Sequence, residues 1–319
     1  MANTNPYGNK NLNKSNKAKE DEFYTQISFI ENELKYYKEH FKDKIVFCNC
    51  DDPEYSNFWL YFQLNFFELG LKKLISTHFD KEKPSYKMEI VATETDNQIG
   101  IPDYVKTPLK ENGDFRSPEC VEILKEADVI VTNPPFSLFR EYLDLLIKNK
   151  KEFLIVGNLN AVKYKEVLPL IMNNKIWLGK NSGHYWFRVP DYYEEKRTDF
   201  KIDENGVKWR RMGNICWFSN LDFKERHDDI KLYSSYDESK YPKYDTYDAI
   251  EVARVNEIPA DLPLDTVFGV PITFMPKYNP DQFEIIGVLN SGSGNEYDLE
   301  KAVVNGKQLY SRFLIRRKR

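Results

Sequence analysis

The sequence has few of the features that would direct a chain into a membrane or out of the cell. No apolar run approaches the roughly 20 residues that span a bilayer. The first twenty residues, MANTNPYGNKNLNKSNKAKE, lack the apolar core of a secretory signal. Only four of the 319 residues are cysteines, and the C-x-C spacing of Cys48 and Cys50 is wrong for a zinc knuckle. We therefore expect a cytoplasmic protein with buried thiols and with neither a disulfide framework nor a metal site.

Positive charge is also not in excess, because 46 Lys and Arg are set against 50 Asp and Glu, for a net charge of −4. This balance argues weakly against a nucleic-acid partner, but the distribution of charge matters more than its sum. Basic clusters occur at 10–19, 208–211 and 312–319. Each cluster alone is typical of a solvated tail or loop, and together they are compatible with a surface that faces phosphates.

Short apolar runs alternate with amphipathic segments through the first 175 residues. This alternation is typical of an α/β fold with a doubly wound, mainly parallel sheet that helices cover on both faces. Such sheets bind ligands at the carboxyl ends of their strands. Buried strands are predicted at 44–50, 72–79, 128–133 and 151–158, a hairpin strand at 86–94, and helices at 28–42, 53–70, 118–127, 138–149 and 163–174.

Three polar motifs lie where this fold would place a ligand: CDDP (50–53), NGDFRS (112–117) and NPPF (133–136). Each has a structural alternative. Asp52 and Pro53 can begin a helix, Ser117 can cap one, and two prolines can form a rigid link from strand to helix. Since Ser137 already offers a cap to the helix after NPPF, the two prolines indicate more than a link.

Taken in order, the motifs resemble those of the EcoRI-type adenine-specific DNA methyltransferases, which use S-adenosylmethionine. The resemblance covers nearly the whole chain and implies a Rossmann-like methyltransferase fold. An NPP motif with an aromatic residue also occurs in enzymes that methylate glutamine or RNA, so the ordered set is the more specific signal. The matching segments are DEFYTQ (21–26), CNCDDPEYSNF (48–58), GDFRS (113–117), VTNPPFSLFREYLD (131–144), YKEV (164–167), KIWLG (175–179), YPKYD (241–245) and GVPITF (269–274).

The resemblance assigns catalysis to the NPPF motif. The side-chain oxygen of Asn133 and the carbonyl of Pro134 would accept the two N–H groups of the adenine amino group and aim its lone pair at the methyl group. Pro135 would stiffen the turn, and Phe136 would stack on the purine. Because a paired base cannot reach such a pocket, the enzyme is expected to flip it out of the duplex. The candidates for a second aromatic clamp are Trp177, Trp186 and Phe187.

The resemblance also implies a binding site for S-adenosylmethionine. Its expected residues are Tyr24 and Thr25 at the methionine carboxylate, Asp51 and Asp52 at the ammonium group, and Asp114 and Phe115 at the adenine. The sequence departs from the general methyltransferase pattern in two places. No glycine-rich loop follows the first strand, and no acidic residue ends the strand KKLISTH, where a ribose contact is expected; Asp80 is the nearest.

Three regions are expected along the chain. A disordered basic tail occupies 1–20, a catalytic domain 21–230, and a target-recognition region 231–319, with recognition loops that can begin near 180. The arginines available there to phosphates or base edges are Arg188, Arg197, Arg210 and Arg211.

The predicted enzyme is a site-specific N6-adenine methyltransferase that acts on double-stranded DNA as a monomer. It would belong to a restriction–modification system or act as a solitary methylase. A cognate restriction endonuclease would act on the same site without having to bind the enzyme. Two alternatives stay open, namely methyl transfer to RNA or to a protein glutamine, and a DNA-binding module without catalysis.

Overall fold

The computed structural model describes residues 24–50, 52–79, 85–92, 100–290 and 301–319. The predicted tail at 1–20, Asp51 and Asp80 lie outside these residues. By their internal contacts the described residues form two compact units. The first contains the described residues up to Asn158 together with Gly183–Leu221, and the second contains Leu159–Ser182 and the described residues from Asp222 to Arg319.

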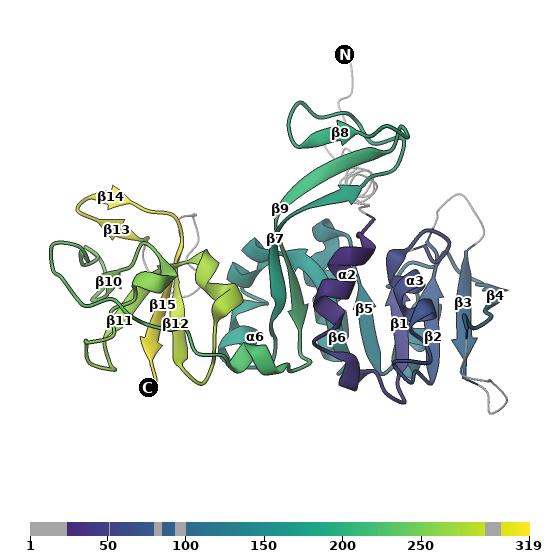
Figure 1. Cartoon of the computed structure of the whole chain (residues 1–319), viewed down its shortest axis with the longest axis horizontal. Helices are drawn as coiled ribbons and strands as arrows, with labels where there is room; N and C mark the ends of the chain where they lie inside the picture. Colours follow the sequence, from purple (N-terminus) through teal and green to yellow (C-terminus); the bar gives the residue numbers. More distant parts are fainter. Residues whose placement is uncertain (1–23, 51, 80–84, 93–99, 291–300) are drawn as a thin grey trace, which may run out of the picture. The chain divides into compact units, whose positions relative to one another are not determined.

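A large mixed sheet organises the first unit, with strands in the order β4-β3-β2-β1-β5-β6-β9-β7 and β8 paired to β9 (Figure 1). The start of β7, residues 177–182, is counted with the second unit. The central pairs β2–β1, β1–β5 and β5–β6 are parallel, whereas β3, β4 and β9 run antiparallel to their neighbours. The strands are β1 (Ile45–Asn49), β2 (Lys73–Thr77), β3 (Tyr86–Val91), β4 (Val105–Pro108), β5 (Val129–Thr132), β6 (Glu152–Asn158), β7 (Trp177–Arg188), β8 (Phe200–Ile202) and β9 (Lys208–Ser219).

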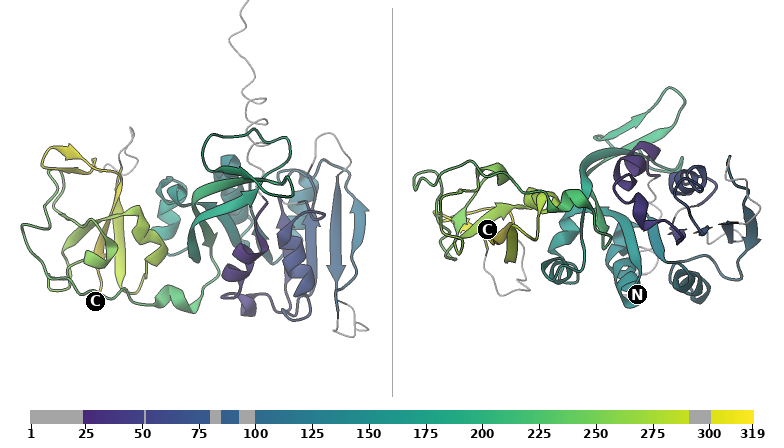
Figure 2. Two further views of the ribbon diagram at one scale, coloured as in Figure 1. Left: turned by 45° about the horizontal axis from the view of Figure 1, so that its top comes forward. Right: turned by 60° about the horizontal axis from the view of Figure 1, so that its bottom comes forward.

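Helices cover both faces of this sheet. They are α2 (Ile27–Leu34), α3 (Asn57–Leu64), α4 (Pro118–Glu126) and α5 (Phe139–Lys148). Figure 2 shows α2 and α3 on one face and α4 and α5 on the other. Strand β5 is buried along its whole length, and β1 and β2 are buried apart from their first residues, as expected for strands covered on both faces. The prediction of an α/β fold with a mainly parallel, doubly wound sheet is confirmed.

Two predicted helix caps are wrong. Helix α3 begins after Ser56, whose Oγ accepts hydrogen bonds from the amides of Phe58 (3.1 Å) and Trp59 (3.5 Å). Asp52 instead accepts the amide of Glu54 within a turn before the helix. Ser137 does not cap α5, because it lies inside the 3-10 helix η2 (Phe136–Leu138). Ser117 does cap α4, and its Oγ accepts the amide of Cys120 at 3.2 Å.

Strand β9 continues past the sheet. Only its last five residues, Ile215–Ser219, pair with β6, whereas Lys208–Arg210 pair with β8. Figure 1 shows β8 and the adjoining half of β9 projecting as a ribbon beyond β6. Two of the candidate arginines lie here, Arg210 with its guanidinium bonded to the carbonyl of Asp199 (3.2 Å) and Arg211 ion-paired to the Asp199 carboxylate (3.6 Å).

The second unit contains a smaller sheet of order β10-β11-β15-β12, a short hairpin of β13 and β14, and helix α6 (Leu168–Met172). Its strands are β10 (Ile250–Glu251), β11 (Val267–Pro271), β12 (Phe283–Leu289), β13 (Val303–Val304), β14 (Lys307–Gln308) and β15 (Arg312–Arg317). The remaining 3-10 helices of the described residues are η1 (Lys38–His40), η3 (Leu159–Lys163), η4 (Lys224–His227), η5 (Val255–Glu257) and η6 (Ile272–Lys277). No helix in the described part of the chain has the length and apolar character needed to cross a membrane.

The C-terminal basic cluster is a strand rather than a solvated tail. It forms β15, between β11 and β12. Arg312 donates to the Glu251 carboxylate (2.9 Å), Arg316 donates to Glu284 (2.5 Å), and the nearly buried Arg317 donates to the Ala260 carbonyl (2.7 Å). Arg312 and Arg316 are therefore paired with acids of the second unit, and Arg317 is held by a backbone carbonyl.

Another ionic cluster in the second unit centres on His227. Its Nδ1 lies 2.6 Å from Asp281 Oδ2, and its Nε2 lies 3.0 Å from Asp222 Oδ2. The hydrogen bonds to Asp281 and Asp222 raise the pKa of His227 above its usual value. The imidazolium therefore bridges two carboxylates that come from separate parts of the sequence.

We expect His227 to make stability depend on pH. Because the folded state raises the pKa of His227, its contribution is complete below the unfolded value of about 6.5 and is lost as the pH rises through the folded value. The urea midpoint of the protein should thus fall as the pH rises above about 6.5. In His227→Gln this part of the fall should disappear, and in His184→Gln, which changes an exposed histidine of the first unit, it should persist. Equal pH profiles for the wild type and His227→Gln would contradict the proposed ionic bridge.

Candidate functional site

The NPPF motif lies at the end of β5. Asn133 follows the strand directly and is only 7% exposed, and Pro134 is also buried. The carbonyl of Pro135 accepts the amide of Leu138 (2.9 Å), which starts the 3-10 turn that leads into α5. Phe136 is half-buried at the first position of that turn. The motif is therefore a rigid strand-to-helix link, and the same link fixes where Asn133 and the Pro134 carbonyl lie.

Strand β1 is joined to this motif by hydrogen bonds. Thr132 Oγ1, one residue before Asn133, donates to the carbonyl of Asn49 at the end of β1 (3.3 Å). Tyr142 of α5 donates its hydroxyl to Asn49 Oδ1. Asn49 is 1% exposed, and its Nδ2 has no hydrogen-bond partner among the described residues. The ends of β1 and β5 thus form one polar region beneath the NPPF turn.

After β1 the chain turns sharply. Cys50 has φ of +124°, a backbone conformation that residues other than glycine seldom adopt. The carboxylate of Asp52 then accepts the Tyr86 hydroxyl (2.6 Å) and the Glu54 amide (3.0 Å). Burial, followed by the hydrogen bond to Asp52, raises the pKa of Tyr86. Methyltransferases commonly have a glycine-rich loop after the first strand. In this chain, hydrogen bonds to Asp52 stabilise the corresponding segment instead.

The GDFRS loop approaches the end of β2 very closely. Gly113 has φ of +76°, and a Cβ at this position would lie 1.9 Å from the carbonyl oxygen of His78. The next residue, Asp114, has its carboxylate bonded to Arg116 Nη2 (2.6 Å) and Nε (2.8 Å). Phe115 is buried and packs edge-on against Tyr142, with 5.1 Å between ring centroids. The loop therefore depends on a glycine and reaches both the end of β2 and the side chain that contacts Asn49.

The predicted N-terminal motif lies beside α3. The Tyr24 amide donates to the Arg188 carbonyl (2.9 Å), which forms an isolated bridge with the end of β7. Asn57 Nδ2, at the start of α3, donates to the carbonyl of Thr25 (2.7 Å). Thr25 is 2% exposed, and its Oγ1 lacks a hydrogen-bond partner within the described part of the chain. A buried hydroxyl is thus available near the N-terminal end of α3.

The three aromatic candidates for a base clamp differ in their surroundings. Phe187 is 1% exposed and packs against Phe29, so it is a core residue. Trp177 lies in the second unit, where the Arg226 guanidinium stands 4.0 Å from its ring centroid. Trp186 is half-buried, and the Lys201 ammonium lies 4.7 Å from its ring centroid.

Sequence reasoning missed four polar or aromatic residues that connect the predicted ones, namely Asn49, His78, Tyr86 and Tyr142. Asn49 and His78 carry one usable signal, since each is a polar residue at or just after the end of a predicted buried strand. Tyr86 and Tyr142 carry none, because a tyrosine in a strand or on a helix face is most often a core residue.

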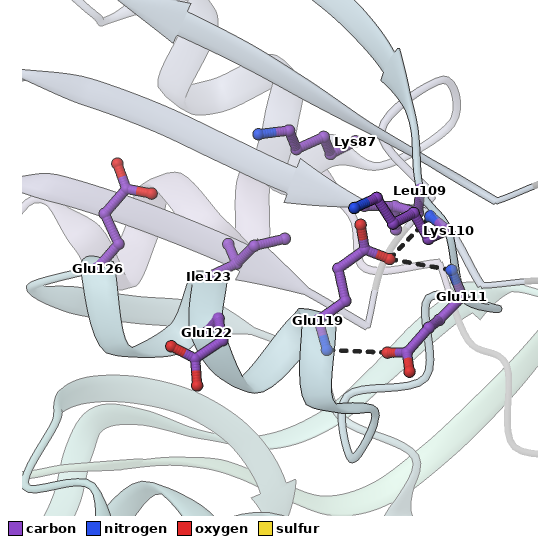
Figure 3. Close-up of a pocket in the computed structure, with 8 residues that line it drawn as sticks. All are labelled: Lys87, Leu109, Lys110, Glu111, Glu119, Glu122, Ile123 and Glu126. Carbon is purple, nitrogen blue, oxygen red and sulfur yellow. Dashed lines mark hydrogen bonds between the residues drawn. The ribbon is translucent and has the colours of Figure 1, made fainter.

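An open depression of about 510 Å³ lies elsewhere in the first unit, between α4 and the segment after β4. Four glutamates line it, and Figure 3 shows Glu119 accepting the amides of Lys110 and Glu111 while its own amide donates to the Glu111 side chain. None of the predicted catalytic or cofactor residues contributes to its lining. Its acidic side chains are partly used to hold the loop before α4.

Comparisons with known proteins agree with the motif order. The family model described as adenine-specific methyltransferase EcoRI matches residues 11–318. The type II methyltransferase M.EcoRI of Escherichia coli is 48% identical over 98% of this chain and 97% of its own length. M.MgeORF184P of Mycoplasma genitalium is 38% identical over 96% and 98%, and M.MpnI of Mycoplasma pneumoniae is 38% identical over 87% and 85%, respectively. No solved structure gives a significant match.

The close approach at Gly113 can be tested against a matched glycine. Gly206 has nearly the same φ, +78°, but a Cβ there would meet nothing within 4 Å. Gly206→Ala should therefore lower the free energy of unfolding by about 1 kcal/mol through backbone strain alone. Gly113→Ala adds a clash with a backbone oxygen and should cost about 2–4 kcal/mol. Urea unfolding measures both, and equal losses would show that the contact with His78 is not tight.

Proposed function

The chain belongs to the EcoRI family of adenine-specific methyltransferases, and on that premise we propose how its residues transfer a methyl group from S-adenosylmethionine to the exocyclic amino group of a flipped adenine. The prediction of an adenine-specific DNA methyltransferase is confirmed by the family match and the three relatives. The alternative of methyl transfer to RNA or to a protein glutamine has no support among these relatives.

The catalytic role rests on the position of Asn133. It is a buried amide at the carboxyl end of a central parallel strand, where open α/β sheets bind their ligands. The amino group of adenine is a weak nucleophile because its lone pair is delocalised into the ring. The Asn133 oxygen and the Pro134 carbonyl accept its two N–H groups, which orients the lone pair and stabilises the positive charge that develops on nitrogen. Pro135 holds the turn, and Phe136 stacks on the base.

When bound, S-adenosylmethionine supplies an electrophilic methyl group on a sulfonium ion. The residues of the first unit fit such a group. Thr25 offers a buried Oγ1 that has no partner among the described residues, which suits a carboxylate acceptor beside Tyr24. Asp52 offers a carboxylate that is 22% exposed, which suits an ammonium group. The neighbouring Asp51 is assigned to the same ammonium group by its motif.

The adenine of the cofactor is assigned to the GDFRS loop. Phe115 provides an aromatic ring that packs edge-on against Tyr142. The Asp114 carboxylate accepts three hydrogen bonds from Arg116, two from its guanidinium and one from its backbone amide. Arg116 therefore fixes the carboxylate of Asp114, which is assigned to the amino group of the cofactor's adenine by its motif.

Duplex DNA is the proposed substrate, and the enzyme has to flip the target base at a cost of a few kcal/mol. Trp186 is the aromatic residue we assign to the flipped base, since Phe187 belongs to the core and Trp177 is covered by Arg226. Site recognition is assigned to residues after about 180, including 231–271. A monomer in the cytoplasm, either solitary or paired with a restriction endonuclease, is the state in which we propose that it acts.

Nucleoside analysis tests the proposed reaction. The protein is incubated with S-adenosylmethionine that carries a labelled methyl group and with duplex DNA of varied sequence, and the DNA is then digested to nucleosides. The label should appear in N6-methyl-2′-deoxyadenosine and in no other nucleoside. Label in cytosine, or no label on any duplex, would refute the proposal.

The role of Asn133 is tested by two substitutions. Asn133→Ala removes the acceptor and should lower kcat by about 100-fold or more, as expected for the loss of a group that orients and stabilises the reacting atom. Asn133→Asp keeps an acceptor oxygen and should retain more activity than the alanine variant. Both should bind S-adenosylhomocysteine like the wild type in calorimetry. An equal loss of cofactor binding in Asn133→Ala would show instead that the residue supports the fold of the cofactor site.

A further inference from the structure

The end of β2 presents a histidine where the sequence lacks an acid. His78 directly follows β2 and is 8% exposed. Strand β2 is the parallel neighbour of β1, with Thr77 opposite Asn49, so His78 lies beside the end of the strand that leads into Asp52. In sheets of this kind a nucleotide binds across the strand ends, and the strand next to the first one supplies the ribose contact. The location of His78 therefore suits a hydroxyl-bearing ligand.

The imidazole of His78 is held on several sides. It stacks on the ring of Tyr86 with 4.8 Å between centroids and an interplanar angle of 9°. The Lys106 ammonium lies 3.7 Å from the centroid of the same tyrosine ring and ion-pairs with Glu54 (2.5 Å). The backbone amide of His78 donates to the Tyr86 carbonyl (2.9 Å), which continues the pairing of β2 with β3. The ring of His78 therefore lies against Tyr86, whose own ring also contacts Lys106.

The two ring nitrogens differ in their partners. His78 Nε2 lies 3.7 Å from Asp52 Oδ2, and the other oxygen of that carboxylate accepts the Tyr86 hydroxyl. Because Nε2 faces this carboxylate, we assign the ring proton to Nε2, which leaves Nδ1 as an acceptor. Nδ1 is buried and has no hydrogen-bond partner among the described residues. A buried acceptor without a partner is costly, which indicates that a donor from a ligand completes it.

The residues assigned to the cofactor's adenine approach the same strand end. The carbonyl of His78 limits the space at Gly113, and Asp114 and Phe115 follow immediately. Asp52, assigned to the ammonium group, faces Nε2 of the imidazole at 3.7 Å. In S-adenosylmethionine the ribose connects the adenine to the amino acid part, so a ribose contact belongs between these two groups of residues.

We propose that His78 Nδ1 accepts a hydrogen bond from a ribose hydroxyl of S-adenosylmethionine, with Asp52 fixing the tautomer, in place of the acidic residue that the sequence lacks. The inference rests on the proposed function and adds a binding residue to it. The His78–Asp52 pair supplies an acceptor as a carboxylate does, but without placing a second full negative charge beside Asp52. A ligand without the ribose hydroxyls should gain nothing from His78.

The test is a double-mutant cycle between His78 and the ribose. The wild type and His78→Phe, which keeps a ring to stack on Tyr86, are titrated by calorimetry with S-adenosylhomocysteine and with its 2′-deoxy and 3′-deoxy analogues. In the wild type, one of the two analogues should bind about tenfold more weakly than the parent, as for the loss of one hydrogen bond. His78→Phe should bind the parent about tenfold more weakly and should bind that analogue no more weakly than the parent.

Two further variants separate a ribose contact from a structural role. His78→Asn keeps a side-chain acceptor and should recover part of the discrimination between parent and analogue. His184→Phe, which changes an exposed histidine of the same unit, should behave like the wild type. If the wild type does not distinguish either analogue from the parent, or if His78→Phe distinguishes them as the wild type does, the inference is wrong. If the wild type does not bind S-adenosylhomocysteine at all, the cofactor assignment itself fails, whatever His78 does.

Discussion

The parallel pairing of β1 with β5 is the constraint on which the rest of the site depends. Because both strands end at the same edge of the sheet, Asn133 and the turn after Asn49 become neighbours although 83 residues separate Thr132 from Asn49. The hydrogen bond from Thr132 Oγ1 to the Asn49 carbonyl and the bond from Tyr142 to Asn49 Oδ1 secure that pairing at its open end. A register shift of one residue would turn these polar groups towards the opposite face. The pairing of β1 with β5 therefore positions both the catalytic and the cofactor-binding residues.

In the proposed cofactor site, hydrogen bonds to Asp52 stabilise the segment after β1, where other nucleotide-binding proteins have a glycine-rich loop. Cys50 makes the sharp turn with a positive φ. The Asp52 carboxylate accepts hydrogen bonds from the Tyr86 hydroxyl and the Glu54 amide, and it faces the imidazole of His78. Among the described residues of this region, a close backbone approach requires a glycine at Gly113, where the next loop meets the end of β2. The absence of a glycine-rich loop thus changes how the site is built, and the edge of the sheet that it occupies stays the same.

The central strands were predictable because each is a short apolar run bounded by polar residues, and burial on both faces leaves little else for such a run to do. Helix ends were less predictable. Helix α2 ends at Leu34, since the buried Tyr37 donates its hydroxyl to Glu33 and the chain tightens there into a 3-10 turn. Strand β15 was missed because RFLIRRKR has the charge of a tail, whereas acids and a carbonyl that its arginines contact lie 32 to 61 positions away in the sequence.

The site shows the same division. NPPF and GDFRS carry local signals, so their residues were found from the sequence, and the structure describes how a 3-10 turn and a glycine position them. His78, Tyr86 and Tyr142 act through partners in other elements, and no local pattern records a stacked ring or a shared carboxylate. The division of the chain at 230–231 into a catalytic and a recognition region stays a prediction. The two compact units follow another division, because Leu159–Ser182 belongs to the second unit and Gly183–Leu221 belongs to the first.

The most direct measurement is a crystal structure of the enzyme with S-adenosylhomocysteine. The account predicts that the ligand lies across the carboxyl ends of β1 and β2, with its adenine against Phe115, a ribose hydroxyl on His78 Nδ1 and its sulfur directed towards Asn133. A ligand bound in the acidic depression beside α4, or at any place remote from the ends of β1 and β5, would contradict it.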